Sequence, residues 1–395
     1  MPARVDSLRH DIESLTKSGA FGEIVDRCHV ELTMARREGN ASVEIIALLG
    51  LAQAQCSLGH FEFARDYVNQ AVYGANVIAA VSLTIDALLA RARIAREGYL
   101  QTGMALEDYR QAVDLAFEAG DMRRYALAVL GMGEIASSPD DSSKHAWKVI
   151  DIAREIKDDQ LEARAILMLS NSFMRKNDYS KANDGLLVAL RKAQAAKDRL
   201  LESVIIGQQG VVLAQDADSF ERGLEQQLTA LEVARGLEAV FHEFMRLYML
   251  AMTLAAANDL TEARRYYDQM LALAQDIQHA PYEMYTLGMI GQWQELRQNL
   301  DSAIIYYGRA VDMARAVSNP QSEARYLYAL GAVYMSQWKF AAARQEDDKA
   351  RAIYQSLDDG RNATRVRASI WYTYLMAVAT RILRLLGARP TGEQS

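Results

Sequence analysis

The chain has 395 residues, half of them hydrophobic, and a formal net charge of −7. Residues 361–389 hold six arginines and no acid, so removing these six positive charges from −7 leaves −13 for the rest. An acidic body argues against nucleic acid as a main partner, because nucleic-acid-binding proteins present basic patches or stripes. Two cysteines, Cys28 and Cys56, are too few for a disulfide framework or a cysteine-rich metal site.

The amino terminus, residues 1–6, has no apolar core of the kind found in signal peptides. No stretch of the chain is apolar and uncharged for long enough to cross a bilayer. Together with the low cysteine content, these features predict a cytoplasmic protein in a reducing compartment.

A small residue recurs along most of the chain at a nearly constant interval. An interval of about 40 residues is typical of stacked helical hairpins, each of which is too small to bury its own apolar face. The recurring positions are Ala64, Ala105, Ala146, Ala182, Gly223, Ala263, Ala303 and Ala343.

Taken in chain order, a degenerate first hairpin fits residues 7–38, with its turn at residues 19–21. Later turns are expected at residues 59–61, 177–179, 258–260 and 298–300, where Gly or Asn tolerates a positive φ. The turns near residues 97–102 and 137–143 are expected to be longer. Pro281 and Pro320 are expected in the first turn of new helices. Nine hairpins result, and residues 361–386 form a nineteenth helix.

The repeat resembles the tetratricopeptide repeat over roughly residues 8–357. In the unit ending at Ala182, Leu169 and Ser170 precede Asn177-Asp178-Tyr179, and the unit ending at Ala263 follows the same pattern. The period of about 40 exceeds the usual value of about 34 in this family and approaches that of HEAT and armadillo repeats, which fit the pattern less well. The resemblance is weaker at Ala105 and Ala146.

The resemblance implies an all-α, right-handed, TPR-like superhelical solenoid of about nine hairpins over residues 1–360, belonging to the long-period subset of the family. Residues 361–395 then form a basic, aromatic terminal helix and a short tail. Gln227 and Asp347 stand where the family pattern has an aromatic residue. They indicate either a shifted register or a loosened contact.

Catalytic motifs give no support for an enzyme. Gly131-Met132-Gly133-Glu134-Ile135-Ala136 fits a dinucleotide fingerprint but lies inside a predicted helix, where that motif has no meaning. His242-Glu243 lacks the second histidine of a zinc-binding motif. We therefore expect no catalytic residues, no cofactor and no metal.

In the tetratricopeptide-repeat family the first helix of each hairpin lines an inner groove. This resemblance implies a peptide-binding groove, because Met and Tyr supply adaptable contact area, and amides and arginines grip backbone and carboxylate groups. The alternative is that these side chains pack against one another inside a tightly wound superhelix. The implied groove residues are Arg164, Asn171, Gln208, Gln215, Met245, Tyr248, Met252, Tyr285, Gln292, Arg325, Tyr328 and Met335.

The terminal helix is aromatic on nearly all sides and basic. It is interpreted as a cap for the last repeat, with docking of a partner, self-association, or contact with an anionic membrane as alternatives. The candidate docking residues are Trp371, Tyr372, Tyr374, Arg381 and Arg384.

The sequence thus predicts a non-enzymatic adaptor or scaffold that binds a protein or peptide in the groove of its solenoid. A peptide-responsive sensor that changes superhelical pitch and acts through a partner is the alternative, and an oligomerising scaffold is a third. Nucleic acid is not expected as a partner.

Overall fold

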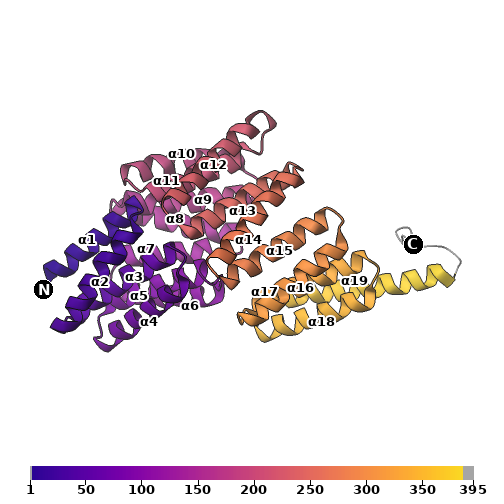
Figure 1. The fold of residues 1–395 in the computed structure, drawn as a ribbon, viewed down its shortest axis with the longest axis horizontal. Coiled ribbons are helices and arrows are strands. Elements are labelled where there is room, and N and C mark those ends of the chain that lie inside the picture. The colour runs from indigo at the N-terminus through magenta and orange to yellow at the C-terminus, as the bar shows by residue number, and fades with distance from the viewer. Residues whose placement is uncertain (1, 386–395) are drawn as a thin grey trace. The chain divides into compact units, whose positions relative to one another are not determined.

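The computed structural model describes residues 2–385, with the side chains of residues 4–380. This part of the chain contains nineteen α-helices and no strand, which confirms the predicted all-α solenoid of nine hairpins and one further helix (Figure 1). In chain order the helices are α1 (Pro2–Ser18), α2 (Phe21–Glu38), α3 (Ala41–Ser57), α4 (Phe61–Val77), α5 (Val81–Glu97), α6 (Thr102–Glu118), α7 (Met122–Glu134), α8 (Pro139–Glu155), α9 (Asp159–Arg175), α10 (Tyr179–Ala195), α11 (Arg199–Leu213), α12 (Phe220–Gly236), α13 (Val240–Ala256), α14 (Leu260–Asp276), α15 (Ala280–Leu296), α16 (Leu300–Ala316), α17 (Pro320–Ser336), α18 (Phe340–Ser356) and α19 (Gly360–Leu385), with a short 3₁₀ turn, η1 (Ala217–Ser219), before α12.

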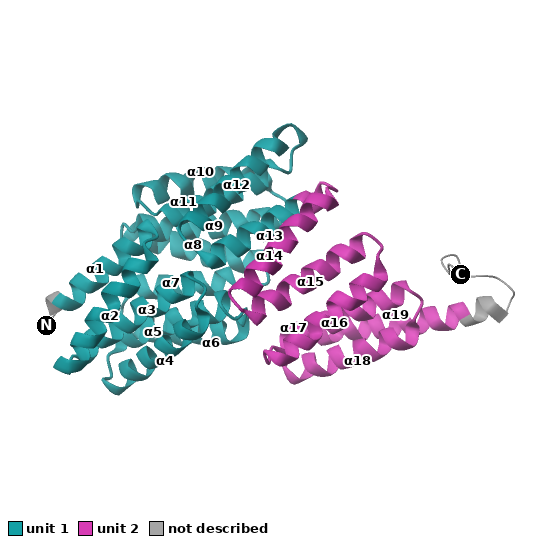
Figure 2. Ribbon diagram, viewed as in Figure 1, with its two compact units in different colours: residues 1–253 teal, residues 254–395 magenta. Residues whose placement is uncertain are grey.

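Two compact units divide the chain, one of residues 1–253 and one of residues 254–395 (Figure 2). The boundary falls inside α13, so no linker separates the units in sequence. The prediction that residues 1–360 act as a single solenoid domain stays a prediction.

Helix length and connector length are nearly constant along the chain. Most helices have 17 residues, and a three-residue connector usually follows. Successive helices therefore begin at a constant interval, as Ala41, Phe61 and Val81 do. Two helices with their connectors make one hairpin, which accounts for the interval between the recurring small residues.

The connectors share one backbone geometry. The middle connector residue adopts a positive φ, as Asn177 does at 60° and Asn258 at 63°. The next residue closes one helix and opens another. The Asp178 N–H donates to the Phe173 carbonyl at 2.9 Å, and its carboxylate accepts from the Lys181 N–H at 3.3 Å. The connector is therefore a C-cap fused to an N-cap.

The departures from this spacing have local causes. The longer turns expected after α5 and α7 are present, and α7 is shortened to 13 residues. A third long connector, which the repeat pattern does not predict, lies between α11 and α12, where Asp216 caps η1 in place of the usual turn. Pro281 and Pro320 lie in the first turns of α15 and α17, as predicted.

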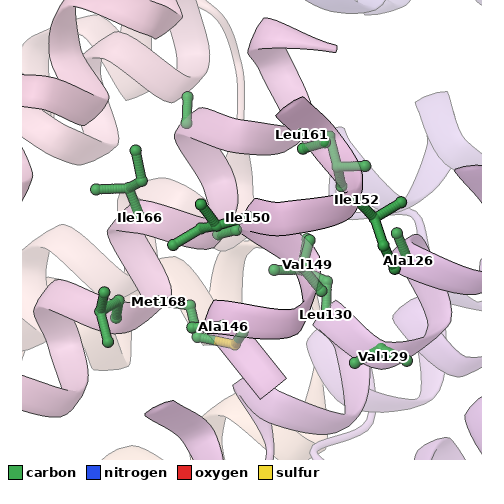
Figure 3. Packing of buried hydrophobic residues seen from close by; sticks show 14 of the residues in the cluster. Ala126, Val129, Leu130, Ala146, Val149, Ile150, Ile152, Leu161, Ile166 and Met168 are labelled. Carbon is green, nitrogen blue, oxygen red and sulfur yellow. The ribbon is translucent and has the colours of Figure 1, made fainter. Parts of the chain in front are cut away.

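The recurring small residues let paired helices approach closely. The seven alanines of the set are fully buried, and a Cβ on Gly223 would lie 2.6 Å from the carbonyl oxygen of Gly210. Larger aliphatic side chains fill the adjoining space. Figure 3 shows this packing between α7, α8 and α9, with Val129, Ile150 and Ile166 around Ala146.

Gln227 and Asp347 keep the register of the repeat. Each lies four residues after the recurring small residue and is buried, as Tyr307 is at the same position of its hairpin. Each also faces a glycine of the preceding helix, since a Cβ on Gly331 would lie 2.3 Å from Asp347 Oδ1. The shifted-register interpretation is therefore wrong, and a polar group replaces the aromatic ring inside the core.

The first unit turns back on its own beginning. A Cβ on Gly59, between α3 and α4, would lie 3.2 Å from the Cβ of Val240 at the start of α13. The turn at Gly19 contacts Leu237 in the same way, and Leu8 of α1 shares a hydrophobic core with Ala239. These contacts bring α13 beside the early hairpins, so the first helices of successive hairpins face one inner space.

The backbone geometry of the connectors predicts opposite effects for two glycines of the first unit. Gly39 has a φ of 67° and Gly22 lies in α2, and a Cβ at either position meets no atom within 4 Å. Gly39→Ala is expected to lower the free energy of unfolding by about 1 kcal/mol through backbone strain, whereas Gly22→Ala raises it by about 0.5 kcal/mol. Urea denaturation of the two variants checks this; a neutral or stabilising Gly39→Ala contradicts the connector account.

Asp347 predicts a pH-dependent stability. Neither of its carboxylate oxygens accepts a hydrogen bond of standard geometry, and burial raises its pKa from 3.8 to about 6, against a smaller lowering by the Ser369 hydroxyl. The folded state thus binds a proton more tightly than the unfolded state, so stability falls by about 3 kcal/mol as the pH rises from about 4 to about 6 and then stays level.

Asp347→Asn is expected to remove this fall and to raise the thermal unfolding temperature at neutral pH. The neighbouring Asp348 pairs with Arg351 at 3.1 Å on an exposed surface, so Asp348→Asn is the matched control. Equal pH profiles for Asp347→Asn and the parent protein would show that the carboxylate is not the group responsible.

Candidate functional site

The groove residues predicted in the first unit differ in the solvent exposure of their side chains. Arg164, Asn171, Met245 and Tyr248 are half-buried or partly exposed. Met252 and Gln215 are more open, and the Gln215 amide donates to the Val211 carbonyl of its own helix at 3.1 Å. Gln208 is buried on α11, and its Oε1 has no hydrogen-bond partner.

In the second unit most of the predicted groove residues already contact other side chains of that unit. Arg325 stacks on the rings of Tyr285 and Tyr326, with 5.7 and 4.8 Å to the ring centroids, and donates to the Tyr326 hydroxyl at 2.8 Å. Tyr328 lies beneath Arg365 in the same way. Met335 contacts the Thr373 hydroxyl of α19 at 3.4 Å. Gln292 remains exposed.

The terminal helix α19 packs along α18 through its buried residues, among them Val366 and Thr373. Trp371, Tyr372 and Tyr374 all point outward and are exposed. Trp371 lies one hairpin period after Gly331, where earlier first helices carry a small residue that admits their partner helix. The predicted docking face is thus open on α19, and docking itself stays a prediction. The side chains of Arg381 and Arg384 lie outside the described residues.

A group of basic side chains gathers in the inner space of the first unit. We name it the inner arginine cluster: Arg93 and Arg96 on α5, Arg164 on α9 and Arg246 on α13. Arg93 and Arg96 lie near Arg164, and both they and Arg246 lie near His242. Arg93 and Arg96 both bind the buried carboxylate of Glu97, at 2.9 and 2.6 Å. Arg96 also pairs with Glu134 of α7, which Arg164 reaches only at 3.7 Å. Four arginines and two paired glutamates leave a formal charge of +2.

Arg246 is the least compensated member of the inner arginine cluster. It is 5% exposed, its Nη1 makes a long hydrogen bond of 3.4 Å to the Val204 carbonyl, and its Nε has no partner. Gly207 makes room for the guanidinium, because a Cβ there would lie 2.4 Å from Nη1. A buried cation with few hydrogen-bond partners and no carboxylate lowers the stability of the folded state unless another group binds it.

The pKa shifts in the inner arginine cluster agree with an excess of positive charge over carboxylates. Burial raises the pKa of Glu97, but Arg93 and Arg96 outweigh it and hold the value at about 2. Burial lowers the pKa of Arg246 to about 10, and burial with Arg93 and Arg96 does the same to Arg164. Burial also lowers the pKa of His242, one turn before Arg246, to about 3, so it is neutral at physiological pH.

No other feature of the described residues competes as a site. A shallow pocket of about 460 Å³ lies at the turn between α8 and α9, and its lining includes Lys17, Arg123 and Lys157. Both of its carboxylates are already paired, Asp158 with Arg123 at 3.0 Å and Asp159 with Lys192 at 2.7 Å. The side chains of residues 4–380 include no cluster of potential metal ligands. Within the described chain, no helix is long and apolar enough to cross a membrane.

A tetratricopeptide-repeat family profile matches residues 245–277, which cover the end of α13 and α14. The chain thus contains a tetratricopeptide repeat at residues 245–277. The wide, constant interval between helix starts, as from Leu260 to Ala280, places it in the long-period subset, as predicted. No curated protein sequence matches the chain.

Solved structures of tetratricopeptide-repeat type share the fold at low sequence identity. A Rap protein complexed with Competence and Sporulation Factor has a TM-score of 0.59 at 10% identity, over 96% of this chain and 99% of that one. The human IFIT1 dimer with m7Gppp-AAAA has a TM-score of 0.50 at 13% identity, over 88% of this chain and 76% of that one. A sensor-containing signal-transduction ATPase, PH0952 from Pyrococcus horikoshii, has a TM-score of 0.50 at 11% identity, over 87% and 56%.

Sequence reasoning found Arg164 but missed Arg93, Arg96 and Arg246. The family pattern is weak in the repeat that contains α5, so it assigns no face to these arginines. A signal was nevertheless present, because Arg91, Arg93 and Arg96 crowd the end of an otherwise apolar helix. Arg246 lies beside Gly207 of the preceding first helix, about one hairpin period earlier, as Tyr326 lies beside Gly288, and no local pattern marks it as a member of the cluster.

The tetratricopeptide-repeat framework predicts that Arg246 lowers stability. Arg246→Met is expected to raise the free energy of unfolding by about 1–3 kcal/mol, because a buried cation without a carboxylate is replaced by an apolar chain of similar length. Arg124→Met is the control and is expected to lower it by about 1–3 kcal/mol, since Arg124 binds Asp86 at 2.6 and 2.9 Å. Chemical denaturation measures both, and a destabilising Arg246→Met contradicts this description of the site.

Proposed function

We propose that this protein is a non-enzymatic adaptor that binds a peptide, or an extended segment of a partner protein, on the inner face of its first unit. The observation that carries the proposal is the exposure of Arg164, whose side chain is 37% exposed although it lies in the inner space with the α5 arginines. An inner space that solvent reaches, lined by amide, thioether, phenol and guanidinium groups, suits a peptide. A cytoplasmic location belongs to the same proposal.

A peptide-responsive sensor is the second candidate. The Rap structure supports it, because a chain of the same fold along nearly its whole length was solved there with Competence and Sporulation Factor. An adaptor holds one shape when it binds, whereas a sensor changes the arrangement of its hairpins. The two candidates share the inner binding face and differ only in that response.

The groove is tested by selection from a pool of short random peptides, followed by calorimetry with the recovered sequences. Met245→Ala and Tyr248→Ala are expected to weaken binding of a recovered peptide about tenfold, because both remove contact area from the inner face. Leu187→Ala, at an exposed position of the second helix α10, is expected to leave the affinity unchanged.

Equal losses in all three variants, or no recovered peptide, would contradict the proposal. Solution scattering with and without the recovered peptide then separates the two candidates. A changed radius of gyration indicates a sensor, and an unchanged one indicates an adaptor.

A further inference from the structure

We propose that the inner arginine cluster is an anion subsite that selects acidic peptides, so that ligand carboxylates complete the partnering of Arg164 and Arg246. This inference rests on the proposed function and adds to it the charge of the ligand. The four arginines face only two paired carboxylates, Glu97 and Glu134. The protein thus leaves about two positive charges for a ligand to balance.

The hydrogen-bonding state of each arginine shows where an acidic group would bind. Arg93 and Arg96 are held in place by Glu97, which fixes their guanidinium groups. Arg164 has a single long ion pair, and Arg246 has an Nε without a partner. A carboxylate accepts paired N–H groups from a guanidinium at low entropic cost when the guanidinium is already in position. Arg164 and Arg246 are therefore the two anchor points.

The groups around the inner arginine cluster leave its charge intact at physiological pH. His242 lies near both Arg246 and the α5 arginines and is neutral there, while Glu97 is ionised. Tyr109 and Cys56 are the other titratable neighbours of Arg93, and burial holds Cys56 as the thiol. The attraction for an acidic ligand is therefore expected to be constant near neutral pH.

A peptide fits the surroundings better than a phosphate chain does. Gln208 lies next to Gly207, which borders Arg246, and its buried Oε1 needs a donor. A peptide offers backbone N–H donors beside its carboxylates, whereas a phosphate backbone offers acceptors only. The net charge of −7 also opposes general binding of nucleic acid.

The test uses the full chain and two labelled pools of short random peptides that differ only at three fixed positions, which are Asp in one pool and Asn in the other. Fluorescence anisotropy is expected to show at least about tenfold tighter binding of the Asp pool at about 50 mM salt, with the difference shrinking at about 500 mM. Arg246→Met and Arg164→Met are each expected to remove most of this preference. Arg110→Met, an exposed arginine of α6, makes the same charge change and is expected to retain it.

The outcomes separate this inference from the proposed function. Equal binding of both pools, or an Asp preference that survives in Arg164→Met and in a folded Arg246→Met, overturns the anion subsite and leaves peptide binding standing. Absence of binding by either pool overturns both. Tighter binding of a labelled 5′-phosphorylated oligoadenylate than of the Asp pool, lost in Arg164→Met, overturns the assignment to peptides.

Discussion

The structure depends on one backbone constraint, the left-handed residue at the centre of each three-residue connector. That residue ends a helix, and the residue after it caps the next one, so helix length and spacing are fixed together. Twelve non-glycine residues of the described chain accept this conformation, with φ between 50° and 63°. They accept it at a steric cost because the hydrogen bonds of the connector and the packing of two helices hold them there.

The regular spacing allows the first unit to close on itself, and closure creates the candidate site. Successive first helices present their inner faces to one space, so side chains on α5, α9 and α13 affect one another's charge states. Glu97 and Glu134 compensate only part of the positive charge collected there. Burying the remaining positive charge without a carboxylate is expected to cost the folded state stability at this site.

The sequence predicted the hairpins well because their signals are local. Gly59, Asn177 and Asn258 are residue types that favour a positive φ, and the buried alanines recur at the hairpin period. Lys157 and Trp338 adopt the same backbone conformation without a local signal, and only the period locates them. The site was predicted in part, because Arg164 follows the family pattern. Arg246 contacts Gly207 through the stacking of neighbouring hairpins, whereas the approach of α13 to the α5 arginines depends on closure of the first unit, which leaves no periodic mark in the sequence.

Closure of the first unit is the central claim, and a disulfide trap tests it most directly. A Cβ on Gly59 would lie 3.2 Å from the Cβ of Val240, close to the separation found in disulfides. The double variant Gly59→Cys with Val240→Cys, made with Cys28 and Cys56 replaced by serine, is predicted to form an intramolecular disulfide under mild oxidation, seen by mass spectrometry. Two thiols that stay free under the same oxidation would contradict the closed first unit and the inner site built on it.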